Sequence, residues 1–201
     1  ASRIPLVLVN TSHPSYNYFM MNDHLGGYMA GEHLVKKGFE RLGMITSGTQ
    51  TRSSLERERG FKDALKNYKM KIDKDLFITG DSDKHGGFTE EAGFEAIYKY
   101  DTMGKYPDAV FCANDTQALG ALHALTKLGL SVPNDIALMG YDNIKFTKYM
   151  DLTTIDQKMH TIGIQATSRL AEIIKNPTDQ LYQTTINPVL IERGSTQNLK
   201  S

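Results

Sequence analysis

Polar side chains that could bind a ligand follow several short apolar segments of the sequence. Asn114 and Asp115 come directly after the apolar run 109–113, and Tyr141 and Asp142 follow the run 136–140. Polar residues also follow apolar runs at three other places: residues 10–13, 47–52 and 80–82. Amide, carboxylate and hydroxyl groups form hydrogen bonds with polar ligands. These residue types indicate binding chemistry, provided that the fold brings them to one place.

Residue patterns that catalysis or a cofactor would require are missing from the sequence. No serine stands in a Gly-x-Ser-x-Gly turn, no Gly-rich phosphate loop is present, and the 6 histidines lack metal-binding spacing. His33 lies in an apolar helical segment and Cys112 in an apolar run, so we expect both side chains to be packed. The sequence therefore predicts no enzyme, no cofactor and no metal site.

Short apolar segments alternate with longer amphipathic segments along most of the chain. Five brief apolar runs have the pattern of strands covered on both faces: residues 5–9, 42–46, 76–79, 109–113 and 136–140. Four segments have the length and pattern of helices: residues 26–37, 53–68, 89–100 and 116–128. This alternation predicts an α/β fold with doubly wound parallel sheets. Such folds bind ligands beyond the carboxyl ends of the strands, where the polar segments would gather.

Two of the predicted helices carry signals at their ends. The residues from Ser53 to Glu56 have the form of a capping box, which predicts a helix start at Ser53. Asp115 occupies the expected N-cap position of the helix 116–128, and Gly129 follows its last turn.

The composition is that of an ordinary soluble globular protein. Lys+Arg and Asp+Glu both number 23, so the formal net charge is zero and direct binding to DNA is disfavoured. The single cysteine excludes an internal disulfide and fits a reducing compartment. We see neither a signal peptide nor an apolar run long enough to span a membrane. A cytoplasmic location is therefore expected.

Six motifs are spread over almost the whole chain. In order they are IPLVLVN at 4–10, GGYMAGEHL at 26–34, RERGF at 57–61, AND and ALG at 113–115 and 118–120, VPNDIALMGYDN at 132–143, and LTT at 152–154 followed by Gln157. Together, and in this order, they resemble the effector-binding domain of the lactose-repressor (LacI/GalR) family of transcription regulators.

This resemblance implies a periplasmic-binding-protein-like fold of type I, with two α/β lobes and an effector cleft between them. The chain would cross between lobes near Met21, near Gln157–Met159 and again near Thr184. A partial N-terminal lobe would comprise residues 1–21 and 159–183, and a complete C-terminal lobe residues 22–157 and 184–201. Family members carry more of the first lobe and a DNA-binding domain before the position of Ile4. We therefore expect the chain to be a truncated piece of a longer regulator.

The ligand positions of the family fall on side chains that suit a sugar. A sugar presents adjacent hydroxyl groups, and carboxylate, amide and guanidinium groups can bind two of them at once. By resemblance, Arg57, Asn114 and Asp142 are the central ligand residues. The respective alternatives are a surface arginine, a helix cap and a turn residue. Gln157 would either contact the ligand or brace the crossing.

Four further positions are candidate ligand contacts by the same resemblance. His13 corresponds to a polar first-lobe contact in some members. Met21 and Met159 stand where an aromatic residue often covers the sugar, with packing between the lobes as the alternative. Ser82 replaces the aromatic platform of some members, which favours a small hydroxylated ligand over a planar base. At Asp23 the usual Asp-Asn order of the family is reversed, which puts that residue in doubt as a contact.

The resemblance also implies a mechanism and partners. Sugar binding would be coupled to operator binding by a DNA-binding domain outside this chain, of the lactose-repressor or the winged-helix type. A homodimer formed through surfaces of the second lobe is expected. A sugar-binding protein of a transport system shares the fold, but the motifs at 132–136 and 152–154 disfavour it. An α/β enzyme would need catalytic groups that the sequence lacks.

Overall fold

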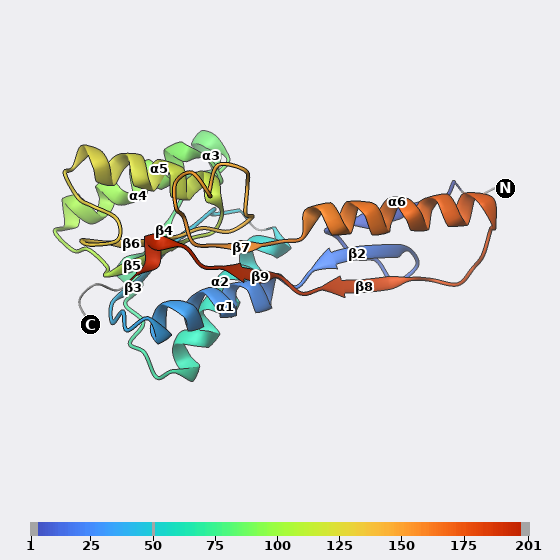
Figure 1. Ribbon diagram of the computed structural model, residues 1–201, viewed down its shortest axis with the longest axis horizontal. Helices are drawn as coiled ribbons and strands as arrows, with labels where there is room; N and C mark the ends of the chain where they lie inside the picture. Colours follow the sequence, from blue (N-terminus) through green and yellow to red (C-terminus); the bar gives the residue numbers. More distant parts are fainter. Residues whose placement is uncertain (1–3, 50, 198–201) are drawn as a thin grey trace. The chain divides into compact units, whose positions relative to one another are not determined.

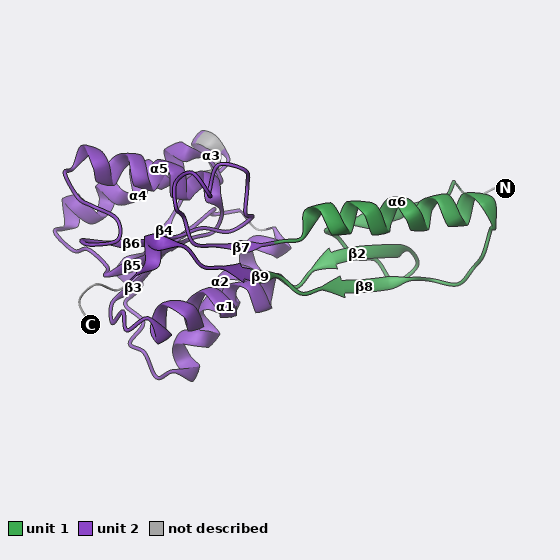
Figure 2. Ribbon diagram, viewed as in Figure 1, with its two compact units in different colours: residues 1–22, 157–189 green, residues 23–156, 190–201 purple. Residues whose placement is uncertain are grey.

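The computed structural model describes residues 4–49 and 51–197 of the chain, which forms two compact units (Figures 1 and 2). Unit 1 consists of Ala1–Asn22 and Gln157–Val189. Unit 2 consists of Asp23–Asp156 and Leu190–Ser201. The chain therefore passes from one unit to the other three times.

The last of these passages differs from the one predicted near Thr184, because it follows Val189. Strand β8 (Gln183–Ile186) stays in unit 1, since it pairs in parallel with β2 (Asn17–Met21). This boundary depends on backbone hydrogen bonds between strands. The side-chain pattern of β8 does not predict them.

Unit 2 is built on a four-stranded sheet in which every neighbouring pair of strands is parallel. In the order β4-β3-β5-β6, the strands are Phe77–Thr79, Leu42–Thr46, Ala109–Cys112 and Ala137–Met139. These are four of the predicted strands, and the predicted α/β fold with parallel sheets is confirmed. Connections between parallel strands cross over the sheet, so all four strands end at one edge.

Two pairs of helices cover the two faces of this sheet (Figure 1). Helices α1 (Asp23–Lys36) and α2 (Arg52–Asn67) pack on one face, and α4 (Glu90–Met103) and α5 (Asp115–Lys127) on the other. On β3, Met44 faces the first pair while Ile45 faces the second. Because successive strand residues point to opposite faces, both must be apolar, which explains the continuous apolar runs.

Short elements complete unit 2. They are the 3-10 helices η1 (Lys74–Leu76) and η2 (Gly194–Thr196), the single-turn helix α3 (Ser82–His85), and the two-stranded pairing of β7 (Thr154–Asp156) with β9 (Val189–Ile191). Among the described residues, no helix has both the length and the apolar character needed to cross a membrane.

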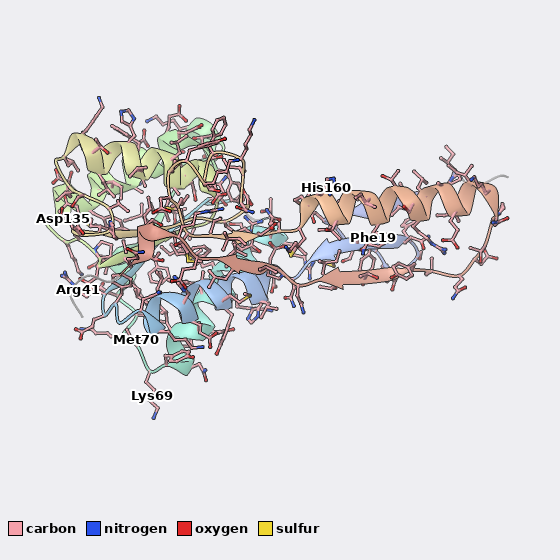
Figure 3. All side chains as sticks on the ribbon, viewed as in Figure 1. Phe19, Arg41, Lys69, Met70, Asp135 and His160 are labelled. Atoms are coloured by element: carbon pink, nitrogen blue, oxygen red, sulfur yellow. The ribbon has the colours of Figure 1, made fainter. Side chains whose placement is uncertain are left out.

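Unit 1 is smaller and has one helix among its described residues. Its parallel sheet has the order β1-β2-β8, with β1 at Val7–Val9, and the helix is α6 (Met159–Lys175). Phe19 on β2 packs against the buried residues of α6 (Figure 3). The apolar pattern predicted β1, whereas β2, β8 and α6 were not predicted.

The helix starts differ from the predicted ones at two places. Helix α2 is capped by Thr51, whose hydroxyl accepts from the Ser54 backbone N at 3.4 Å, so the capping box at Ser53 is wrong. Helix α5 is capped by Asn114, whose side chain accepts from the Gln117 backbone N, so the N-cap at Asp115 is also wrong. In each case the side chain that can reach a free N–H of the first turn takes the cap.

Candidate functional site

Arg57 is buried at the carboxyl edge of the unit 2 sheet, with only 6% of its surface exposed. Its Nε donates to Asp23 Oδ1 at 2.9 Å, and its Nη1 donates to the backbone oxygen of Ala113 at 2.8 Å. Nη1 also lies 3.6 Å from Asp142 Oδ1. The guanidinium carbon lies over the Tyr141 ring. Arg57 is therefore not a surface arginine, and the structure brings it together with Asp142 as predicted.

Close packing of α1 against α2 carries Arg57 to this position. A Cβ atom at Gly27 would lie 2.0 Å from the backbone oxygen of Arg57, and one at Gly60 would lie 2.0 Å from that of His24. Only glycine allows the two helix backbones to approach this closely. At Gly26 a Cβ would lie 2.4 Å from the Tyr141 hydroxyl, so the site also depends on the missing side chain there.

The charges around Arg57 stabilise its ionised form. Burial by itself lowers the pKa of Arg57, but Tyr141 and the carboxylates of Asp23 and Asp142 raise that pKa on balance. Burial likewise raises the pKa of the Tyr141 hydroxyl, which stays neutral and donates to Asp23 Oδ1 at 3.3 Å. Burying a cation costs free energy unless charged partners compensate for its lost hydration, and here two carboxylates do so. Asp23, which the sequence left in doubt, is thus part of the cluster.

Asp142 stands on a turn with an unusual backbone. Its φ is 120° and that of Asn143 is 56°, in the region that residues with a side chain rarely adopt. The backbone N of Asp142 donates to the Ile155 oxygen at 2.8 Å, which ties the turn to β7. Its carboxylate is half-buried, with side-chain exposure of 24%. Asp142 therefore combines contact with Arg57 and access to solvent.

Asn114 lies at the same edge but is engaged within the protein. Its Oδ1 caps α5, and its Nδ2 donates to the backbone oxygen of Phe88 at 2.9 Å. The neighbouring Gln117 donates through Nε2 to the Gly87 oxygen at 2.6 Å and to the Thr46 oxygen at 3.2 Å. Asn114 therefore does cap α5, and its contact with a ligand stays a prediction. The amide also fixes the segment that carries Phe88.

Phe88 is a residue of the site that the sequence did not predict. It follows the single-turn helix α3, is half-buried, and packs against the core that Phe111 and Tyr141 help to form. An aromatic side chain therefore does follow β4, later in the chain than expected, so Ser82 gives no reason to exclude planar ligands. The side chain of Ser82 lies outside the described residues. The Gly-Phe-Thr-Glu sequence at 87–90, directly before α4, was the signal that could have found Phe88.

The remaining candidate ligand residues belong to unit 1. His13 is exposed, and its Nδ1 accepts from the Ser15 backbone N at 3.1 Å. Met21 is 2% exposed in the unit 1 core. Met159 is partly exposed, and its sulfur accepts from Asn10 Nδ2 at 3.5 Å. Gln157 is buried. Met21 thus packs inside unit 1, and its contact with a ligand stays a prediction.

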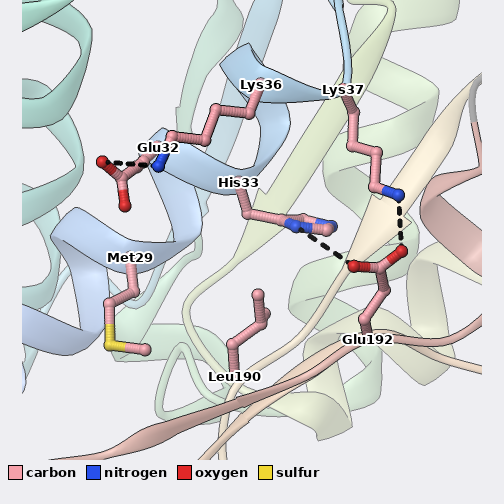
Figure 4. A pocket seen from close by; sticks show the side chains of 7 residues that line it. All are labelled: Met29, Glu32, His33, Lys36, Lys37, Leu190 and Glu192. Atoms are coloured by element: carbon pink, nitrogen blue, oxygen red, sulfur yellow. Dashed lines mark hydrogen bonds and ion pairs between the residues drawn. The ribbon is translucent and has the colours of Figure 1, made fainter.

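A groove of about 310 Å³ lies elsewhere in unit 2, between α1 and β9 (Figure 4). Its lining residues are Met29, Glu32, His33, Lys36, Lys37, Leu190 and Glu192. His33 is buried as predicted, and its Nε2 pairs with Thr196 Oγ1 at 2.9 Å. Burial lowers the pKa of His33, although Glu192 raises it in part. Lys36 and Lys37 both have carboxylate partners, so the described side chains of this groove are internally neutralised.

Among the described residues, metal-ligand clusters and the Cys112 thiol are two kinds of group that could carry chemistry. No cluster of three or more histidine, cysteine, aspartate or glutamate side chains there could hold a metal ion. Cys112 is buried, and burial raises the pKa of its thiol. A thiol that stays protonated in the core is a poor nucleophile.

Comparisons with known proteins agree with this architecture. Residues 32–196 match the model of the periplasmic binding protein-like domain family. The chain is 37% identical over 182 residues to the HTH-type transcriptional repressor PurR of Actinobacillus pleuropneumoniae. The matched region covers 89% of this chain and 52% of that protein. The chain thus spans about half the length of the curated relatives it matches.

Solved structures show the same relationship. The LacI family transcriptional regulator from Enterococcus faecium with bound ribose superposes with a TM-score of 0.87 at 26% identity, covering 98% of this chain and 72% of that one. The CelR transcriptional regulator in complex with cellobiose gives a TM-score of 0.82 at 26% identity, covering 94% and 58%. The fold is that of an effector-binding domain. The chain belongs to the periplasmic binding protein-like family, in the form found in lactose-repressor-type regulators.

Proposed function

We propose that the chain is the sensor of a transcription regulator, and that unit 2 binds a small sugar at the carboxyl edge of its sheet. The observation that carries this proposal is the buried cluster of Arg57, Asp23 and Asp142. It offers a fixed cation and a half-buried carboxylate at the edge where open α/β sheets bind ligands. A hydroxylated ligand needs donors and acceptors side by side, and this cluster supplies both.

Arg57 retains capacity to donate to a ligand. Its described hydrogen bonds use Nε and Nη1, and within the described residues no protein acceptor is assigned to Nη2. Asp142 can accept hydrogen bonds from two adjacent hydroxyl groups. We therefore propose that a sugar contacts Arg57 through Nη2 and Asp142 through its carboxylate. The ribose and cellobiose complexes of related regulators support a sugar as the effector class.

A planar base is a second candidate effector. Phe88, whose backbone oxygen accepts from Asn114, has a half-buried aromatic ring, and aromatic rings stack on flat ligands. The PurR repressors among the relatives also justify testing purines alongside sugars. Sugars and purines therefore belong in the same screen.

The proposal extends to partners. Effector binding would shift the sensor between two arrangements, and a DNA-binding domain outside this chain would prefer one of them. A thousand-fold change in operator affinity requires about 4 kcal/mol of differential binding. We propose a homodimer through the exposed apolar residues Leu119, Phe146 and Tyr149 of unit 2. A regulator of this kind would act in the cytoplasm.

A thermal-shift screen tests the proposed function. The 201-residue chain is heated with pentoses, hexoses, disaccharides and purine bases, beside Arg57→Ala and Asp142→Ala. Arg59→Ala is the matched control, because Arg59 is on the same helix but exposed, and among the described residues it pairs only with Glu56. We expect one compound to stabilise the chain and the control but neither site variant. If no sugar or purine shifts the unfolding temperature of the folded chain, the effector proposal is wrong.

A further inference from the structure

Asp115 is a buried carboxyl group beside the effector site, with 1% of its surface exposed. Its Oδ1 accepts from the Thr154 hydroxyl at 2.6 Å, and its Oδ2 accepts from the Ile144 backbone N at 2.9 Å. Its own backbone N donates to the Tyr141 oxygen at 2.7 Å. Asp115 thus binds both ends of the turn that carries Asp142.

This turn has a conformation that needs support. Asp142 and Asn143 are consecutive residues with positive φ, and such conformations persist only where the surroundings hold them. The Thr154 hydroxyl that donates to Asp115 also accepts from the Asn143 backbone N at 3.3 Å. A Cβ at Gly140 would lie 2.1 Å from Asp115 Oδ1, so the carboxyl group fits beneath the turn because residue 140 is glycine.

We infer that Asp115 is a positioning residue for the effector site: its carboxyl group holds the turn at 141–144 so that Asp142 faces Arg57. This inference rests on the proposed function and adds a residue that need not contact the ligand. Without the carboxyl group, the Ile144 amide and the Thr154 hydroxyl lose their partner. The turn can then relax toward negative φ, which moves the Asp142 carboxylate from its place 3.6 Å from Arg57.

Other contacts hold the surrounding backbone independently of Asp115. The backbone N of Gly140 donates to the Thr153 oxygen at 2.9 Å, and that of Asp142 donates to the Ile155 oxygen. Arg193 Nη2 donates to Asn143 Oδ1 at 3.0 Å. The loss of Asp115 should therefore alter the turn without detaching it from β7, so its effect on the site can be measured in a folded protein.

The test compares Asp115→Ala with Asp115→Asn in the 201-residue chain. Asparagine keeps an acceptor for the Ile144 amide, whereas alanine does not. Asp135→Ala is the matched control, because Asp135 also binds a turn, at Ser131, but precedes β6 and so lies at the opposite edge of the sheet (Figure 3). Thr154→Val removes the same contact from the other side and replaces Asp115→Ala if that variant does not fold.

Two measurements distinguish an effect on the position of Asp142 from a loss of overall stability. In 15N-labelled protein, we expect Asp115→Ala to shift the amide signals of residues 142–144 and the Arg57 Nε–H signal, while Asp115→Asn and Asp135→Ala leave the Arg57 signal in place. With D-ribose as the probe in calorimetry, we expect Asp115→Ala to weaken binding at least about tenfold, and Asp115→Asn less than about threefold.

The outcomes distinguish the inference from the proposed function. If the wild-type chain binds D-ribose and folded Asp115→Ala binds it equally well, the inference fails and the proposed function stands. If the wild type does not bind D-ribose, the ribose version of the proposed function fails, and the spectra still decide the positioning role. Unchanged signals at Asp142 and Arg57 in folded Asp115→Ala would overturn the inference in either case.

Discussion

The guanidinium carbon of Arg57 lies 3.8 Å from the centroid of the Tyr141 ring. The ring covers one face of the cation, and the Asp23 carboxylate accepts hydrogen bonds from both side chains. A cation over an aromatic face is stabilised more strongly where water is excluded, as it is here. Tyr141 therefore partly offsets the free-energy cost of burying the charge of Arg57.

This contact predicts different effects for two substitutions of Tyr141. Tyr141→Phe keeps the ring and loses the hydrogen bond to Asp23, so we expect a loss of about 1 kcal/mol in the free energy of unfolding. Tyr141→Ala also leaves a cavity and should cost at least about 3 kcal/mol. Urea unfolding measures both, with Met103→Ala as a control because Met103 is 45% exposed. Equal losses in the two Tyr141 variants would contradict this account of the ring.

The glycine contacts between α1 and α2 predict a localised effect of added bulk. We expect Gly27→Ala to destabilise unit 2 by more than about 1 kcal/mol, because the new methyl group would meet the backbone oxygen of Arg57. Gly163→Ala on α6 is the matched control, since nothing lies within 4 Å of its Cβ position. Alanine favours a helix, so that control should be stabilised by up to about 1 kcal/mol. Thermal unfolding of the two variants should therefore shift in opposite directions.

The buried carboxyl group of Asp115 predicts a pH-dependent stability. Burial raises the pKa of Asp115 to about 7 from an ordinary value of 3.8; the hydrogen bonds from Thr154 and Ile144 oppose this rise, and Asp142 adds to it. Between these values the folded chain keeps a proton that the unfolded chain has lost. The contribution of Asp115 to the free energy of unfolding therefore falls as pH rises through this window.

Asp115→Asn removes that titration and serves as the reference. We expect the stability of the wild type relative to this variant to fall by about 2 kcal/mol between about pH 5 and about pH 8. Urea unfolding at several pH values measures the difference. A difference that is constant, or that grows with pH, would show that Asp115 ionises in the folded chain at least as easily as in the unfolded one.

The exposed apolar side chains of unit 2 predict the self-association face. Phe146 is 61% exposed, and Leu119 and Tyr149 are exposed as well. We expect Phe146→Glu to weaken a homodimer at least about tenfold, because a charge would have to be buried at the interface. Light scattering coupled to size exclusion measures the mass as concentration changes. Leu55→Glu, at an exposed position on α2, is the control that should leave the mass unchanged.

The interior of unit 2 could be predicted from the sequence because its strands are covered on both faces. Residues such as Val110 and Phe111 face opposite helix pairs, so the whole run must be apolar and is visible in the sequence. Strand β8, which reads Gln-Thr-Thr-Ile, has no such signal. Its place comes from pairing with β2, a contact between segments far apart in the chain. The local residue pattern of β8 does not indicate which distant strand it pairs with.

The meeting of two candidate site residues could be predicted from the sequence, whereas other features of the candidate site could not. Arg57 and Asp142 belong to motifs of the family, and their meeting at the sheet edge follows from a parallel sheet. Phe88 was missed because the aromatic residue was expected directly after Gly80 and Asp81, where the chain has Ser82. The positive φ at Asp142 and the buried partner Asp115 depend on tertiary contacts, which a single sequence does not display.

The pairing of β2 with β8 has a consequence for synthesis on the ribosome. Tyr18 pairs in register with Gln183, so the sheet of unit 1 can form only after residue 183 has been made. All four strands of the unit 2 sheet, by contrast, lie before residue 140. Because domains fold as units in the order in which their segments emerge, the sheet carrying Arg57 would form while β2 is still unpaired with β8. The nascent chain would thus carry an open strand edge for much of its translation, a stage at which chaperones commonly act.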